Sequence, residues 1–157
     1  MTKSIYLFLS NKQERAFITS YLNTEKSGFF GFITELVKNI PLKESSQIAL
    51  ISLHVIQSKD KAIFCQEKEV HVGDSVLMNL CSDNIEASFC GNILLPVLQN
   101  FVFDIGRNIE IFFPKPMFHN LNVSVLSSFD IYFKDVNGGP IYLNRDTQVT
   151  GVFHLKI

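Results

Sequence analysis

The sequence contains no tryptophan, no long uninterrupted apolar run and no cluster of basic residues. Its formal net charge is −1 over 157 residues, so the counterion release that drives general binding to nucleic acid is small. The apolar stretch 93–103 is interrupted by Pro96, Gln99 and Asn100 and is too short to cross a bilayer as a helix. We therefore expect neither nucleic acid nor a membrane among the partners of this protein.

Cysteine is scarce, with only Cys65, Cys81 and Cys90. Their odd number, their apolar neighbours and the absence of a C-x-x-C pair are typical of reduced, buried thiols in a cytosolic or nuclear protein. Residues 1–10 carry one lysine and a short apolar stretch, but polar residues follow at 11–15 in place of the small residues of a cleavage site. We expect a β-strand here rather than a signal peptide.

Motifs for catalysis, metal binding and cofactor binding are also missing. The four histidines, His54, His71, His119 and His154, show no H-x-H or H-E-x-x-H spacing, as a metal site would favour. There is no G-x-S-x-G elbow, and the glycine-containing segments 91–93 and 138–140 do not lead into a predicted helix, as a phosphate-binding loop does. The sequence therefore predicts no enzyme, no metal and no cofactor.

Phenylalanine is abundant, with fifteen residues, and it lies in short segments that alternate apolar and polar side chains. Such segments, bounded by Gly, Pro, Asn and Ser, indicate β-strands. We predict strands at residues 5–9, 29–36, 47–55, 61–66, 75–81, 93–103, 108–113, 127–135 and 148–156. This pattern, without an internal repeat, favours an all-β single jelly-roll sandwich of two four-stranded antiparallel sheets. One domain is expected over residues 1–157, with residues 1–27 as an N-terminal strand or arm packing on it.

Alternation within the strands assigns their faces. In the segment 127–135, Phe129, Ile131 and Phe133 are expected to face the core, and Asp130, Tyr132 and Lys134 the opposite side. The segment 47–55 is apolar on both faces over its first half, which is typical of a central, doubly covered strand. Because a terminal apolar strand needs partners, we expect residues 148–156 inside a sheet, beside residues 29–36.

A series of these segments follows a characteristic order along the chain. It comprises residues 5–10, 23–24, 30–36, 40–42 and 48–53 in the N-terminal half, and residues 76–83, 91, 95–98, 112–114, 129–139 and 149–155 in the C-terminal half. This order resembles the penton-like minor capsid proteins of Polinton/Maverick elements and adintoviruses. The resemblance implies a structural capsid protein of the virion, a homopentamer that occupies icosahedral vertices among double jelly-roll major capsid proteins. It also implies synthesis in the host cytoplasm and allows assembly in the nucleus.

A closed ring of five subunits needs a heterologous interface, in which one surface meets a different surface of the next subunit. The aromatic residues Phe112, Phe118, Tyr132 and Tyr142 are candidates for this interface, and ordinary core packing is the alternative for each. Two other functions share the architecture: a trimeric ligand of the tumour-necrosis-factor type and a cupin-like enzyme. The number of subunits distinguishes the first from a penton, and metal content distinguishes the second.

Overall fold

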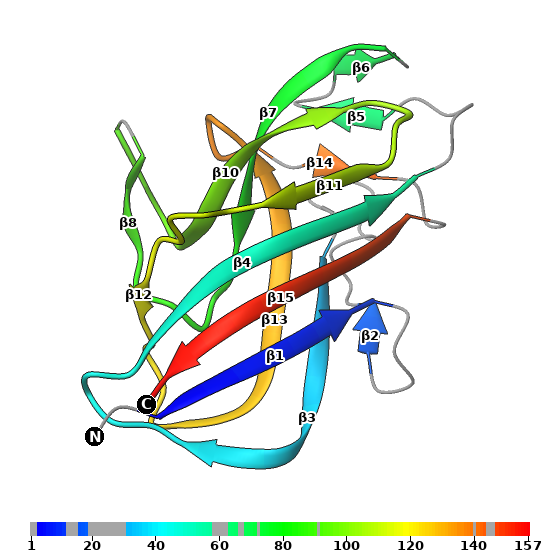
Figure 1. Cartoon of the computed structure of the whole chain (residues 1–157). Helices are drawn as coiled ribbons and strands as arrows, with labels where there is room; N and C mark the ends of the chain where they lie inside the picture. The colour runs from blue at the N-terminus through cyan, green and yellow to red at the C-terminus, as the bar shows by residue number, and fades with distance from the viewer. Residues whose placement is uncertain are drawn as a thin grey trace.

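The computed structural model describes residues 3–11, 16–18, 31–57, 63–65, 68–71, 73–90, 92–139, 141–143 and 147–157; for residues 16–18, 63–65, 68–70, 90 and 142 it describes the backbone alone. These residues form strands and turns, with no helix among them. The strands are arranged in two layers (Figure 1). The predicted all-β class is confirmed.

The first sheet has the order β1-β15-β4-β11, and β12 pairs with β4 outside this path. Its strands are β1 (Ser4–Ser10), β15 (Gln148–Lys156), β4 (Gln47–Ile56), β11 (Ile109–Phe112) and β12 (His119–Asn120). All of its pairings are antiparallel. The C-terminal strand β15 therefore lies in the interior of this sheet, as its apolar alternation predicts.

The second sheet has the order β10-β7-β13-β3-β2 and is also antiparallel. Its strands are β10 (Val97–Asp104), β7 (Ser75–Cys81), β13 (Val125–Asp135), β3 (Gly31–Pro41) and β2 (Ala16–Ile18). Two small sheets complete the described fold: β14 (Ile141–Tyr142) with β5 (Ile63–Cys65) and β6 (Lys68–Val70), and the hairpin of β8 (Ser88–Cys90) and β9 (Ile93–Leu95).

The order of the eight principal strands identifies a jelly roll. Counted along the chain as β1, β3, β4, β7, β10, β11, β13 and β15, they stand in the order first, eighth, third, sixth in one sheet and second, seventh, fourth, fifth in the other. This interleaving of early and late strands is the double Greek key of a jelly roll. The prediction of two four-stranded sheets is thus confirmed, and one short strand, β12 or β2, extends each sheet.

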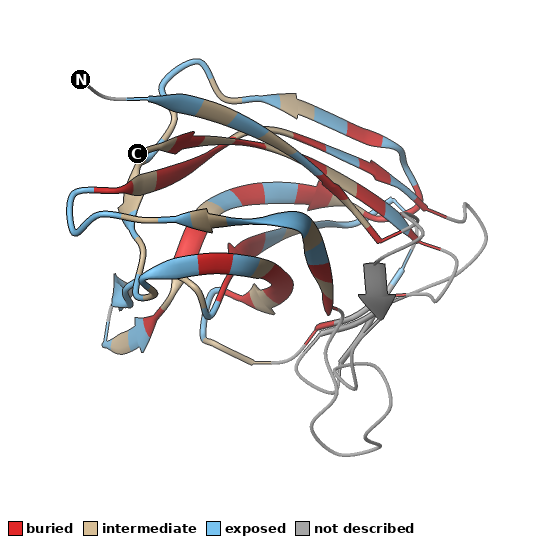
Figure 2. Ribbon diagram, turned by 90° about the horizontal axis from the view of Figure 1, so that it is seen from below, coloured by how far each residue is buried: buried red, intermediate tan, exposed pale blue. Residues whose placement is uncertain are grey.

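Phenylalanine fills the space between the sheets. Phe129 of β13 and Phe153 of β15 are fully buried, and their ring centroids lie 5.2 Å apart, so this pair joins the two layers. Phe133 is also fully buried and packs edge-on against Phe101 and Phe103 of β10, with centroid distances of 5.9 and 6.5 Å. Buried and exposed positions alternate along many strands of both layers (Figure 2).

A β-bulge explains why β4 is apolar on both faces. The pairing of β4 with β15 shifts between Ser52 and Leu50, which reverses the alternation within the strand. Ile48 and Leu50 before the shift, and Leu53 and Val55 after it, all belong to the main core. The prediction of a central strand that is apolar on both faces over its first half is therefore confirmed.

Two further predictions need correction. The C-terminal strand does not lie beside residues 29–36, because β15 pairs with β1 and β4 whereas β3 belongs to the other sheet. The predicted strand 93–103 divides into β9 and β10 at Pro96, which lacks the N–H that would continue a ladder. The N-terminal segment contributes β1 to the first sheet and β2 to the second; residues 12–15 and 19–30 lie outside the described residues.

Candidate assembly surface

Aromatic side chains gather on the outer side of the first sheet. In β1 the residues Ile5, Leu7 and Leu9 pack toward the core, so the alternate residues Tyr6 and Phe8 point outward, where they are 55% and 63% exposed. One cross-strand row runs through all four principal strands of this sheet: Phe8 is opposite Val152, Val152 is opposite Ser52, and Ser52 is opposite Phe112. Phe112 at the far end of this row is 69% exposed.

A second group of rings lies next to this row. The Tyr6 ring stacks on His154 with a centroid distance of 4.7 Å, and Phe118 contacts His154 edge-on at 5.4 Å. The Lys156 Nζ lies 3.7 Å from the centroid of the Phe118 ring, a cation–π contact. Burial and the positive charge of Lys156 lower the pKa of His154, which favours its neutral form. We call the surface formed by Tyr6, Phe8, Phe112, Phe118 and His154 the aromatic face.

Polar residues border the aromatic face on one side. Ser10 is opposite Thr150, Thr150 is opposite His54, and His54 is opposite Glu110. The Thr150 hydroxyl donates a hydrogen bond to Ser10 Oγ at 3.4 Å. An apolar patch rimmed by polar residues is typical of a protein–protein contact site.

A second exposed apolar site lies on the β8–β9 hairpin. Phe89 and Leu94 are directly opposite each other, and Phe89 is 77% exposed. The hairpin projects from the body of the molecule at the left of Figure 1. Sequence reasoning missed this site, although the dipeptide Gly91-Asn92 between Ser88-Phe89-Cys90 and Ile93-Leu94-Leu95 is a hairpin signal.

The same hairpin buries Tyr132. Leu95 and Ile93 of β9 pack with Tyr132 and Cys81 in a small cluster, and Tyr132 is only 4% exposed. Tyr132 thus lies on the side of β13 opposite the main core, as the alternation predicts, but the expectation that it is exposed for a subunit contact is wrong, because a segment outside the two main sheets covers that side of β13. The Cys81 thiol is buried in this cluster, as the sequence predicts; the side chains of Cys65 and Cys90 lie outside the described residues.

Asp130 also lies on the side of β13 opposite the main core and is buried there, and it anchors the loop after β7. Its carboxylate accepts hydrogen bonds from the Ser82 hydroxyl at 2.9 Å and from the Asp83 N–H at 3.1 Å. The Tyr132 hydroxyl donates to Asp83 Oδ1 at 2.6 Å. Burial raises the pKa of the Asp130 carboxyl, against the effect of these hydrogen bonds. Burial and the hydrogen bond to Asp83 raise the pKa of Tyr132, so its phenol stays protonated and donates.

The structure thus brings two of the four candidate interface residues onto one surface. Phe112 and Phe118 belong to the aromatic face, whereas Tyr132 is inside the subunit. Tyr142 belongs to β14, opposite Phe64 of β5, and its side chain lies outside the described residues. Within the described part of the chain, no group of three or more His, Cys, Asp and Glu residues could hold a metal ion, and no helix could span a membrane.

Comparison with known proteins gives a match in fold. No protein-family model matches the sequence, and no curated protein matches it. Among solved structures, the chain is similar to the crystal structure of the mavirus penton protein, with a TM-score of 0.58 over 99% of this chain and 100% of that chain. The sequences are 9% identical. The resemblance to penton-like proteins indicated by the order of segments is therefore confirmed at the level of the fold.

Proposed function

We propose that this protein is a structural, non-enzymatic capsid protein that forms homopentamers at icosahedral vertices. The observation that carries the proposal is the fold, which is similar to that of a viral penton protein over nearly the whole of both chains. Its other partner is then a double jelly-roll major capsid protein, and its location is the virion capsid. The proposal needs no contact with nucleic acid or a membrane.

A five-fold ring requires two different contact surfaces on each subunit, and two sites among the described residues carry exposed aromatic rings. The aromatic face lies on the first sheet, and Phe89 and Leu94 lie on the separate β8–β9 hairpin. Tyr6, Phe8 and Phe112 are each more than half exposed, which leaves roughly 300–450 Å² of aromatic surface in water. A stable interface buries about 800 Å² of surface on each partner. The exposed rings of the aromatic face therefore account for about half of the area that one subunit would bury.

Native mass spectrometry tests the proposal. The purified protein should give a pentamer, and Phe112→Asp on the face or Phe89→Asp on the hairpin should each give monomers, because each buries an unpaired carboxylate at the contact. In an equimolar mixture of the two variants, the intact hairpin of the Phe112→Asp chain can bind the intact aromatic face of the Phe89→Asp chain. The mixture should therefore give dimers. The control Val37→Asp, at an exposed position on β3 of the other sheet, should remain pentameric. A trimer would instead favour a ligand of the tumour-necrosis-factor type, and a strict monomer would contradict self-assembly.

A further inference from the structure

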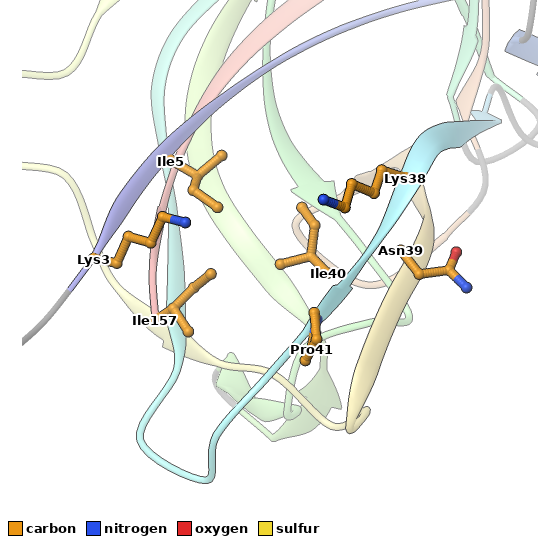
Figure 3. A pocket seen from close by; sticks show the side chains of 7 residues that line it. All are labelled: Lys3, Ile5, Lys38, Asn39, Ile40, Pro41 and Ile157. Carbon is orange, nitrogen blue, oxygen red and sulfur yellow. The ribbon is translucent and has the colours of Figure 1, made fainter.

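A groove of about 320 Å³ opens between the two sheets, where β1 of the first sheet lies near β3 of the second. Ile5, Ile40 and Ile157 form its floor, and all three are partly buried against the main core. Figure 3 shows their side chains directed into the space between the strands. The groove therefore offers an apolar floor that is continuous with the core of the protein.

The first half of β1, at Ser4 and Tyr6, presents backbone groups for pairing along this groove. Lys3 and Ile157 exchange backbone hydrogen bonds of 2.9 and 2.8 Å. This pair shows which residues of β1 form hydrogen bonds with β15 and which do not. Residues 3 and 5 direct their N–H and C=O groups toward β15, so Ser4 and Tyr6 direct theirs to the other side. Among the described strands β1 pairs with β15 alone. An outer edge of this kind can accept an added strand.

The opposite wall of the groove is positively charged, because a bulge in β3 places Lys38 there. Between Glu35 and Ile40 the pairing of β3 with β13 shifts, and residues 36–39 lie opposite the single residue Ser127. Lys38 in this bulge is exposed, as is Lys3 on the β1 side, and Figure 3 shows both ammonium groups directed into the groove. The charged side chains that line the groove are these two lysines. The groove is therefore complementary to a carboxylate.

We propose that this groove binds an extended acidic and apolar segment of a partner protein, which adds to β1 as a further strand. Three features select such a segment together. The Ser4 and Tyr6 backbone groups require donors and acceptors at strand spacing, the isoleucine floor requires an inward apolar side chain, and the lysines require a carboxylate. Residues two positions apart in a strand share a face, so a segment that carries an apolar and an acidic residue two positions apart, both on its inward face, satisfies all three. The contact is separate from the β8–β9 hairpin and does not require a five-fold ring.

Binding of a fluorescein-labelled synthetic peptide that repeats Val-Thr-Glu-Thr, which places valine and glutamate in turn along one face of a strand, tests the charge of the site. Fluorescence anisotropy with the full chain should show saturable binding, and Lys38→Glu should weaken it by about tenfold or more. The matched control Lys115→Glu makes the same charge change at an exposed lysine outside the groove and should bind as the wild type does. A peptide with lysine in place of glutamate should not bind. Circular dichroism should show that both variants keep their fold, since both positions are exposed.

A peptide N-methylated at alternate backbone amides tests strand addition itself. It should not bind, and the unmodified peptide should slow hydrogen exchange at the Ser4 and Tyr6 amides. Equal binding of the two peptides, equal weakening by Lys38→Glu and Lys115→Glu, or no binding at millimolar concentration would overturn the proposal. Displacement of the peptide by dodecanoate, with no protection of the two amides by the peptide, would also overturn it and assign the groove to an anionic amphiphile.

Discussion

Truncating Phe133 to alanine tests the core between the two sheets. The side chain is fully buried and contacts the rings of Phe101 and Phe103, so the variant loses both the transfer free energy of the ring and its packing. Substitutions of this kind cost about 3–5 kcal/mol. For a domain of this size the loss lowers the thermal midpoint by about 6–20 °C. Because the chain has no tryptophan, unfolding should be followed by far-ultraviolet circular dichroism in urea.

Phe112→Ala is the matched control for this experiment, since it removes the same side chain at a position that is 69% exposed. It should lower the free energy of unfolding of the dissociated subunit by less than about 0.5 kcal/mol, yet it should weaken assembly. Lys134→Ala, next to Phe133 in β13, should cost about 0.5 kcal/mol or less, because the Lys134 side chain is only partly buried and does not belong to the main core. Equal losses for Phe133→Ala and Phe112→Ala would refute the assignment of these two rings to core and surface.

Three further substitutions probe the Asp130 network and the first sheet. Tyr132→Phe removes the donor to Asp83 and should cost about 1 kcal/mol in urea unfolding, as for a typical hydrogen bond; an unchanged midpoint would contradict the contact. Because burial raises the pKa of Asp130 in the folded state, protonation of this group adds stability as the pH falls through that raised pKa. Asp130→Asn should remove this contribution, and a difference between variant and wild type that stays constant with pH would argue against it. Gly151→Ala places a Cβ 2.8 Å from the buried Phe153 ring, so it should cost about 1–3 kcal/mol by overpacking, and a neutral result would mean that the ring moves freely.

Local patterns in the sequence predict the strands and much of the core, but they do not predict which strands pair. The alternation of Phe129, Ile131 and Phe133 gives the correct core face of β13, because period-two spacing follows directly from strand geometry. The partners of β15, by contrast, are β1 and β4, from the N-terminal third of the chain. The pattern of residues 148–156 does not indicate which strands pair with this segment, so the prediction that it lies beside residues 29–36 is wrong.

The candidate site shows the same division. The outward position of Phe112 follows from its place in a short alternating strand. Phe118 belongs to the aromatic face because its ring contacts His154 and Lys156. Tyr132 has the alternation of an outward residue, but the β8–β9 hairpin covers it. Phe89 was missed because its strand has three residues, too short for periodicity to be recognised.

The interior position of β15 has a consequence for synthesis on the ribosome. While residues 148–156 are still in the exit tunnel, β1 and β4 have no strand between them, so the first sheet cannot close. The strands of the second sheet, β10, β7, β13, β3 and β2, all precede β15 along the chain, so they leave the tunnel before it does. The nascent chain therefore keeps the facing edges of β1 and β4 unpaired, and the site opposite Phe129 unfilled, until β15 has left the tunnel. Chains that stall before this point expose strand edges prone to intermolecular pairing, and these are substrates for chaperones that bind extended apolar segments.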